Sequence, residues 1–127
     1  MADVEIVLTA AAPKPAGHYS QAVCHGDLVF VSGQLPVTLE GKIAADQSFE
    51  DQARLALKNL LAIVRGAGSS PERVLKVTVF LAGVEYWPQF NAVYAEAFGT
   101  AKPARSVVPV PALHYGCLVE IEAIAAR

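Results

Sequence analysis

Hydrophobic residues recur at different spacings along the chain, and each spacing predicts an element. Steps of three and four residues predict an amphipathic helix over 48–65 and a second helix that begins at Glu85 or Tyr86 and ends at Phe98. Apolar or alternating runs predict strands at 1–8, 20–24, 28–31, 74–81, 106–110 and 117–125. The order strands, helix, strand, helix, strands predicts an α+β domain with two helices on one face of a mixed sheet.

Two of the expected strands differ in pattern. The run at 28–31 is apolar at every position, which is typical of a buried strand. The run at 74–81 alternates, so every second residue is expected to share one face: Leu75, Val77, Val79 and Leu81. We find no repeat, low-complexity tract or charge run, and residues 1–127 are therefore expected to form a single domain.

The composition adds a requirement for further burial. Hydrophobic residues make up 54% of the chain and charged residues only 17%, against about 25% charged in average globular proteins. Such a composition excludes a disordered linker, which needs low hydrophobicity and high charge. Two helices cover only one face of a sheet, yet apolar residues occur on both faces of the strands. We therefore expect a partner subunit to cover the other face.

The charge of the chain excludes some function classes. Ten basic and twelve acidic side chains give a net charge of −2, and the basic residues are scattered singly. Nucleic acid is disfavoured as a partner because duplex-binding domains carry a basic patch. No apolar run reaches the roughly 18–20 residues that a membrane span needs. The sequence therefore predicts neither a nucleic-acid-binding nor a membrane protein.

Cysteine and histidine usage bears on compartment and metal binding. Cys24 and Cys117 form no CxxC pair, and the N-terminal residues are acidic where a signal peptide is basic. These features predict a cytoplasmic protein with reduced thiols. The three histidines are scattered without metal-ligand spacing, so no metal site is expected: His18, His25 and His114.

Two charged residues stand out because their surroundings are apolar. Arg105 enters a Val/Pro-rich strand, where its guanidinium is either paired in a structural salt bridge or available to bind a carboxylate. Glu120 and Glu122 lie two residues apart and share a strand face. One of them could act as a general acid or base. The alternative is an edge strand whose acids face water, which we favour for Glu122.

Two glycine-containing segments place hydroxyl and amide groups close together. They are Gly-His-Tyr-Ser-Gln at 17–21 and Ser-Gly-Gln at 32–34. Both could line a small polar pocket with exposed backbone amides. Ordinary turn formation explains the same residues equally well.

Several segments together resemble the RidA/YjgF-like reactive intermediate deaminase family. The segment 15–23 is similar to its Gly-x-Tyr-Ser-Gln-Ala motif, and 31–36 to its Ser-Gly-Gln-x-Pro motif. The segments 103–106 and 119–125 are similar to its C-terminal signatures. The resemblance runs in order from about residue 13 to residue 125.

This resemblance implies both a fold and an activity. The implied fold is a chorismate-mutase-like (bacillus type) α+β domain that forms a homotrimer with a central barrel and sites at the subunit interfaces. Family members hydrolyse enamines and imines, such as 2-aminoacrylate released by pyridoxal-phosphate enzymes, to 2-keto acids and ammonia. The resemblance implies no cofactor and no metal for this reaction.

The resemblance also implies roles for particular residues. Arg105 would bind the substrate carboxylate, and Glu120 would activate the attacking water and relay protons. Tyr19 and Ser32 would shape the pocket and hydrogen-bond substrate or water, and Gly33 would leave room beside them. Because an imine is already reactive, positioning would supply much of the rate enhancement.

The chain departs from the family pattern near the expected site. Val107 replaces a common cysteine, so only its backbone could contact substrate there. His18 replaces a common proline, and His114 with Tyr115 follows Leu113 where the family usually has Leu-Pro. His114 and Tyr115 could reshape the pocket or simply belong to a surface loop.

Two other functions remain open at this point. Some relatives are associated with ribonuclease or translation-inhibitor activity, which the acidic composition disfavours because phosphate contacts dominate RNA affinity. A non-catalytic module that binds small carboxylates would use the same Arg105.

Overall fold

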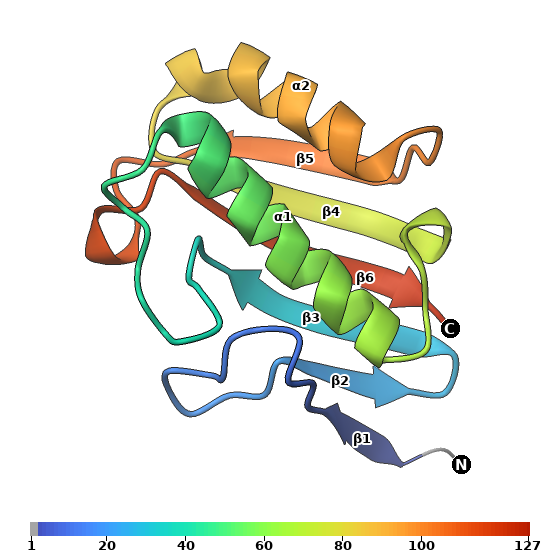
Figure 1. Ribbon diagram of the computed structural model, residues 1–127. Helices are drawn as coiled ribbons and strands as arrows, with labels where there is room; N and C mark the ends of the chain where they lie inside the picture. Colours follow the sequence, from blue (N-terminus) through green and yellow to red (C-terminus); the bar gives the residue numbers. More distant parts are fainter. Residues whose placement is uncertain (1–2) are drawn as a thin grey trace.

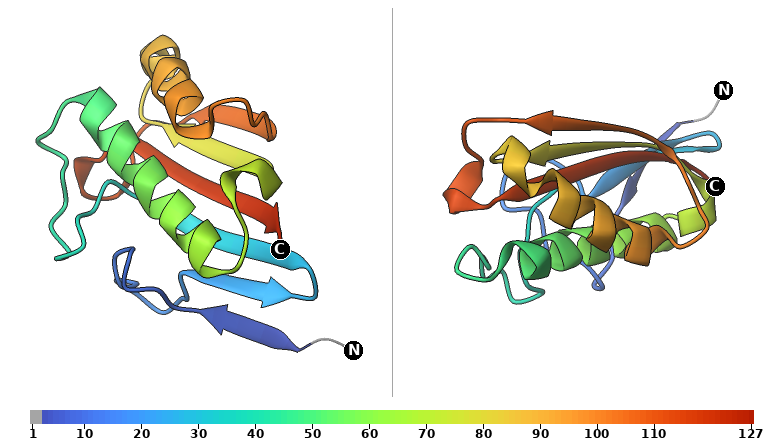
Figure 2. Two further views of the ribbon diagram at one scale, coloured as in Figure 1. Left: turned by 45° about the vertical axis from the view of Figure 1, so that its right-hand side comes forward. Right: turned by 90° about the horizontal axis from the view of Figure 1, so that it is seen from above.

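The computed structural model describes residues 3–127 and contains one six-stranded sheet with two helices on one of its faces (Figures 1 and 2). The helices are α1 (Phe49–Gly66) and α2 (Trp87–Phe98). The strands are β1 (Val4–Val7), β2 (Ala22–His25), β3 (Leu28–Gln34), β4 (Val74–Leu81), β5 (Ala104–Pro109) and β6 (Val119–Ala126). The predicted α+β architecture with both helices on one face is confirmed.

The strand order in the sheet is β1-β2-β3-β6-β4-β5. All neighbouring strands are antiparallel except β4 and β5, which are parallel and joined through α2. The last strand of the chain thus lies between β3 and β4, and β5 forms one edge. Consequently the residues of β6 have a neighbouring strand on both sides.

Helix α1 contributes to the core and also holds the loop after β3 in place through a hydrogen-bonding side-chain amide. Ser48 caps its N-terminus by accepting a hydrogen bond from the backbone N–H of Asp51 at 3.1 Å. Its buried Asn59 donates to the carbonyls of Leu35 and Val37 at 3.2 and 2.8 Å. This amide fixes the start of the connection from β3 to α1.

A second buried amide of α1, Gln52, makes equivalent contacts. Its side-chain nitrogen donates to the carbonyls of Ala45 and Gln47 at 3.3 and 3.0 Å. Its oxygen accepts from the backbone N–H of Leu118 at 3.0 Å, just before β6 begins. One side chain therefore links the end of the long loop to the start of β6.

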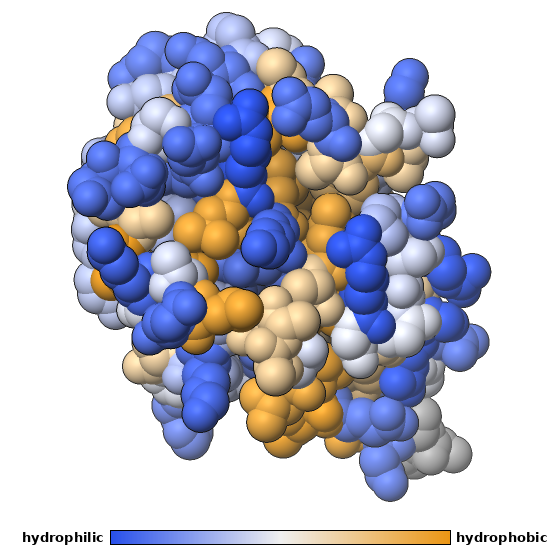
Figure 3. All heavy atoms as spheres, viewed as in Figure 1, coloured by the Kyte–Doolittle hydropathy of each residue, from blue (hydrophilic) through white to orange (hydrophobic). Residues whose placement is uncertain are grey.

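The hydrophobic core lies between the helices and the facing side of the sheet. Its most buried large side chains include Leu57, Leu60 and Ile63 of α1 and Phe90 of α2. Figure 3 shows the helix-bearing side, where hydrophilic side chains border smaller apolar patches. None of the helices within residues 3–127 combines the length and apolarity needed to cross a membrane.

The opposite face of the sheet is apolar and open in the single chain. Ile6 is 73% exposed, and Leu28 and Phe30 are 39% and 40% exposed, while Val29 and Val31 are buried. The run at 28–31 is therefore buried on one side only, unlike the buried strand predicted from its composition. The open face agrees with the expectation that a partner subunit covers it.

The prediction that every second residue of the strand at 74–81 shares the buried face is wrong for one residue. Leu75 is 48% exposed, whereas Val77, Val79 and Leu81 are buried. The register with β6 shifts between Val74 and Lys76, and this irregularity turns Leu75 away from the core.

Strand boundaries also differ from the prediction. Within the described residues β1 spans only Val4–Val7, and residues 1 and 2 lie outside the description. β2 and β3 run further than predicted, to His25 and Gln34. β5 begins at Ala104, so Arg105 lies inside the strand. The last strand begins at Val119 because a 3-10 turn occupies His114–Gly116.

Candidate active site

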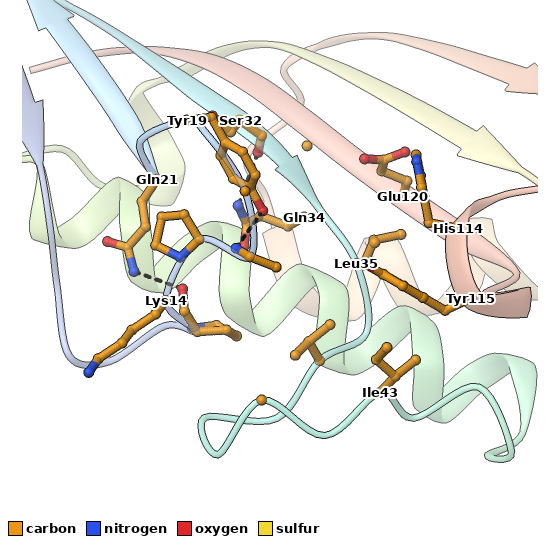
Figure 4. Close-up of a pocket in the computed structure, with 17 residues that line it drawn as sticks. Lys14, Tyr19, Gln21, Ser32, Gln34, Leu35, Ile43, His114, Tyr115 and Glu120 are labelled. Carbon is orange, nitrogen blue, oxygen red and sulfur yellow. Dashed lines mark hydrogen bonds between the residues drawn. The ribbon is translucent and has the colours of Figure 1, made fainter.

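A pocket of about 490 Å³ lies beside β3 and β6. Residues from three segments line it, namely 13–21, 32–43 and 114–120. Figure 4 shows Tyr19 and Ser32 on one side and Glu120 with His114 on another. The pocket thus combines the two glycine-containing segments with the acidic residue of the last strand.

The carboxyl group of Glu120 depends on a neighbouring glycine. A Cβ added at Gly33 would lie 3.1 Å from Glu120 Cδ and closer still to Oε2. Between Val31 and Gln34 strand β3 contains one residue more than the facing stretch of β6, which is a β-bulge. The bulge and the missing side chain together let the carboxyl group lie against the backbone of β3.

The environment of Glu120 favours its protonated form. Burial is the main cause that raises the pKa of its carboxyl group, and the negative charge of Glu122 raises it further. His114 acts in the opposite direction through its positive charge. A carboxyl group with a raised pKa can take and return a proton near neutral pH more readily than an exposed glutamate.

Ser32 and Tyr19 have their hydrogen-bond partners close by. Ser32 donates through Oγ to the carbonyl of Ser20 at 2.6 Å, which leaves the oxygen lone pairs free to accept. The Tyr19 hydroxyl accepts from the backbone N–H of Ala16 at 3.2 Å, and Tyr19 is half exposed. Both hydroxyl groups are therefore oriented by the backbone of the N-terminal loop.

Gln21 holds this loop against the sheet. Its side chain is buried, and its Oε1 accepts from the N–H of Thr9 at 2.7 Å. Its Nε2 donates to the carbonyls of Thr9 and Pro13 at 3.1 and 3.0 Å. Gln21 is thus a structural residue of the pocket wall, a role that its place in a glycine-containing segment did not reveal.

Arg105 and Val107 lie on the other face of the sheet. They pair with Val77 and Val79, whose side chains are buried on the helix side. Glu120 pairs with Phe80, whose side chain points to the open face. A single chain therefore brings Tyr19, Ser32, Gly33 and Glu120 together but leaves Arg105 and Val107 outside the pocket.

The guanidinium of Arg105 packs on aromatic rings. Its Cζ lies 4.7 Å from the ring centre of Tyr94 and 6.0 Å from that of Trp87. Burial raises the pKa of Tyr94 to about 12, partly offset by the Arg105 charge. Within residues 3–127 the ion pairs involve other arginines, so the structural salt bridge considered for Arg105 is not formed within the chain.

The sequence motifs indicate no role for one further pocket residue, Lys14, and leave two alternatives for His114 and Tyr115. Lys14 lines the entrance from the N-terminal loop, and His114 and Tyr115 line it from the turn before β6. All three are exposed, so His114 and Tyr115 belong to a surface turn that also lines the pocket. Glu122 is exposed, as expected for an acid that faces water.

Comparison with known proteins identifies relatives over nearly the whole chain. The family model described as endoribonuclease L-PSP matches residues 9–127. A RutC family protein of Pyrococcus horikoshii is 44% identical over 121 residues, which are 95% of this chain and 96% of that protein.

Solved structures agree with these sequence matches. YyfA of Yersinia pestis, described as a member of the conserved Rid protein family, is 38% identical with a TM-score of 0.93, over 98% of this chain and 100% of that chain. Escherichia coli TdcF, solved with bound serine, is 41% identical with a TM-score of 0.91, over 97% of this chain and 98% of that one. By its sequence, fold and pocket-lining motifs, the chain belongs to the RidA/YjgF-like family, which the endoribonuclease L-PSP model describes.

Proposed function

We propose that the protein is a hydrolytic deaminase that converts reactive enamines or imines, such as 2-aminoacrylate in its imine form, to 2-keto acids and ammonia. The observation that carries this proposal is the Glu120 carboxyl group, which lines the same pocket as the hydroxyl groups of Tyr19 and Ser32 and has a raised pKa. Imine hydrolysis needs one group that accepts a proton from water and later returns it to nitrogen. Glu120 has both the position and the protonation behaviour for this role.

The proposed reaction uses the pocket residues as follows. Ionised Glu120 accepts a proton from a water molecule whose oxygen bonds to the imine carbon. The π electrons of the C=N bond move to nitrogen, and the protonated carboxyl group gives its proton to that nitrogen, which yields a carbinolamine. Ionised Glu120 then takes the hydroxyl proton and passes it to the amine nitrogen, so that the C=O bond forms as ammonia leaves. Ser32 and Tyr19 hydrogen-bond the substrate or water and keep both in line with the carboxyl group. Proton transfer and positioning suffice for this chemistry, so we propose that it needs no cofactor or metal.

The substrate carboxylate is proposed to bind Arg105 of a second copy of the chain. Arg105 lies on the edge strand β5, on the opposite face of the sheet from Glu120, so one chain cannot present both to one small substrate. Its guanidinium has no carboxylate partner within residues 3–127 and offers two parallel donors. The bound serine of TdcF has the α-carboxylate and amino group that such a pocket would accommodate.

The same arrangement supports a homotrimer with sites between subunits. A cyclic assembly gives every subunit one neighbour that contributes Arg105 and another that receives it. The exposed apolar residues of β1 and β3 would be buried in the centre of such an assembly. In it Val107 would contribute backbone groups only, because it has no thiol.

Thiol chemistry is not part of the proposal. Cys117 is buried close to the pocket, and burial, followed by the charge of Glu120, raises the pKa of its thiol. A raised pKa disfavours the thiolate, which is the nucleophilic form. The reaction is therefore assigned to Glu120 and water.

The test is a coupled assay in which a serine or threonine dehydratase or an amino-acid oxidase generates the imine. The protein should accelerate keto-acid release, and both Arg105→Ala and Glu120→Gln should abolish the acceleration. Arg65→Ala, which removes an exposed arginine of α1, should leave it unchanged. Full acceleration by Arg105→Ala would contradict the proposed carboxylate anchor.

Subunit mixing tests whether Arg105 and Glu120 of one site come from different chains. Arg105→Ala and Glu120→Gln chains, each inactive alone, should regain activity when unfolded, mixed equally and refolded. Random cyclic assembly would restore at most about a quarter of the sites. If the mixture stayed inactive while refolded wild type was active, both residues would have to act from the same chain.

The description of the matching family supports one competing function, cleavage of RNA. RNA affinity depends on basic side chains that contact phosphates. The chain has a net charge of −2, and the acidic Glu120 lines its pocket, which disfavours binding of a phosphate backbone. RNA cleavage that persisted through extensive purification and disappeared in Glu120→Ala would favour this alternative. Calorimetric binding of a 2-keto acid without any imine turnover would instead favour a non-catalytic binding module.

A further inference from the structure

His114 lies at the pocket wall opposite the N-terminal loop. It starts the 3-10 turn His114–Gly116, and its carbonyl accepts from the N–H of Cys117 at 3.1 Å. Tyr115 follows with φ of 63°, a left-handed conformation that is unfavourable for a residue with a large side chain. Unfavourable backbone conformations persist where the surrounding structure requires them, often beside functional sites. Here the turn directs His114 toward the pocket (Figure 4).

The imidazole and the Glu120 carboxyl group influence each other across the pocket wall. Figure 4 shows the imidazole ring beside the carboxyl group, and the positive charge of His114 lowers the pKa of Glu120 against the effect of burial. Both side chains line the pocket, and within residues 3–127 no hydrogen bond joins them. Both groups therefore keep free positions for a substrate or water molecule.

Hydrolysis of an imine moves two protons in its first step. The water oxygen loses one proton, and the imine nitrogen gains one. A single carboxylate can perform these transfers only one after the other, whereas a carboxylate and an imidazolium can perform them together. Histidine is suited to the second role because its ordinary pKa of about 6.5 lies close to neutral pH.

We infer that His114 is a second acid–base residue of the proposed deaminase reaction, which protonates the imine nitrogen while Glu120 deprotonates water. This inference rests on the proposed function and adds to it a residue that replaces the usual proline of the family. Because His114 touches the reacting nitrogen in this scheme, it is assigned as a catalytic residue.

The proposed steps balance in atoms and charge. The water oxygen bonds to the imine carbon, the π electrons of the C=N bond move to nitrogen, Glu120 gains a proton and His114 loses one. In the second step, protonated Glu120 gives its proton to the amine nitrogen, and the C–N electron pair leaves with it as ammonia. The hydroxyl proton returns to His114 as the C=O bond forms. Both residues then have their starting charges.

Other titratable groups near the pair enter the interpretation of any pH profile. Glu122 shares the face of β6 with Glu120 and raises its pKa, and the buried Cys117 thiol has its own pKa raised. The remaining titratable groups that line the pocket are Lys14, Tyr19 and Tyr115. The assignment of a limb of the profile to Glu120 or His114 therefore rests on the variants and not on the pH at which the limb lies.

The experiment compares the pH dependence of kcat/KM for imine hydrolysis in wild type and His114→Gln. Wild type should give a bell-shaped profile, rising as Glu120 ionises and falling as His114 loses its proton. His114→Gln should reduce kcat/KM by about 100-fold, should lose the alkaline limb and should shift the acid limb to higher pH. Added imidazole should partly restore the activity of His114→Ala.

His25→Gln is the matched control. His25 lies opposite Leu28, and Leu28 lies opposite Ala126. Ala126 is six residues from Glu120 along β6, which is roughly 20 Å, so His25 lies far from the pocket. The control should keep the wild-type profile with both limbs. If wild type were active and His114→Gln kept both limbs and the wild-type kcat/KM, the catalytic role of His114 would be overturned. The proposed deaminase function would then still stand.

A second measurement does not depend on turnover. The carboxyl ¹³C signal of Glu120 should titrate at a higher pH in His114→Gln than in wild type, because the variant lacks the nearby positive charge. An unchanged titration midpoint would overturn the inferred pairing. Absence of imine hydrolysis by wild type would overturn the proposed function and, with it, the catalytic role of His114, even if the titrations were coupled.

Discussion

Gly33 shows how one missing side chain sets the chemistry of another residue. The Glu120 carboxyl group occupies the space that a Cβ at Gly33 would need. Burial is the main cause of the raised pKa of Glu120, and the backbone at Gly33 is one of the surfaces against which the carboxyl group lies. Replacing Gly33 by a residue with a small side chain should therefore move the Glu120 carboxyl group and leave the fold intact.

Gly33→Ala tests this relation. The added methyl group should displace the Glu120 carboxyl group and lower kcat/KM for imine hydrolysis by about 100-fold, since misplacement by about 1 Å can cost that much. In the double variant with Glu120→Gln, the loss should be no greater than in Glu120→Gln alone, because the two residues act through one group. Additive losses would mean that Gly33 acts independently of Glu120.

At the scale of elements, the helices and strands are largely predictable because their signals are local. Periodicity alone located both helices and the approximate positions of all strands. The outward turn of Leu75 was not predictable, because it results from a register shift against β6, about 50 residues away in the chain. The length of β3 beyond residue 31 likewise depends on its pairing with β6.

The amides of α1 show that an element also positions the loops around the pocket. Asn59→Leu should leave the carbonyls of Leu35 and Val37 without a donor and reduce the free energy of unfolding by roughly 1–3 kcal/mol. Urea unfolding of both proteins at equal concentration would measure this change. Asn91→Leu, the same replacement at an exposed position of α2, should have little effect. Equal stability of Asn59→Leu and wild type would show that these bonds are dispensable.

At the scale of the whole molecule, the proposed trimer would account for both the open sheet face and the separation of Arg105 from Glu120. A second copy that covers the apolar face would also bring the missing guanidinium to the pocket. Interfaces of this obligate kind are more hydrophobic than ordinary surface. The low charge content of the chain is therefore interpreted as a requirement of assembly.

Phe30→Asp tests the link between assembly and activity. Phe30 is 40% exposed on the open face, and a carboxylate there would oppose burial in an interface. Wild type should sediment at about three times the chain mass of 13.4 kDa, whereas Phe30→Asp should sediment as a smaller species without imine hydrolysis. Val84→Asp, at an exposed apolar position in the 3-10 turn before α2, should remain assembled and active. A monomeric and active wild type would contradict both the assembly and the shared site.

The sequence by itself determined the element order, the α+β class, the resemblance to the RidA/YjgF-like family and the residues on which the chemistry is proposed to depend. These features rest on local periodicity and on short motifs, both of which are visible in one dimension. Only the tertiary structure decided that Glu120 lies against Gly33, that Arg105 faces the other side of the sheet and that His114 faces the pocket. The physical reason is that the bulge and register of β3, β6 and β4 determine these positions, and strand pairing joins residues that are distant in the sequence.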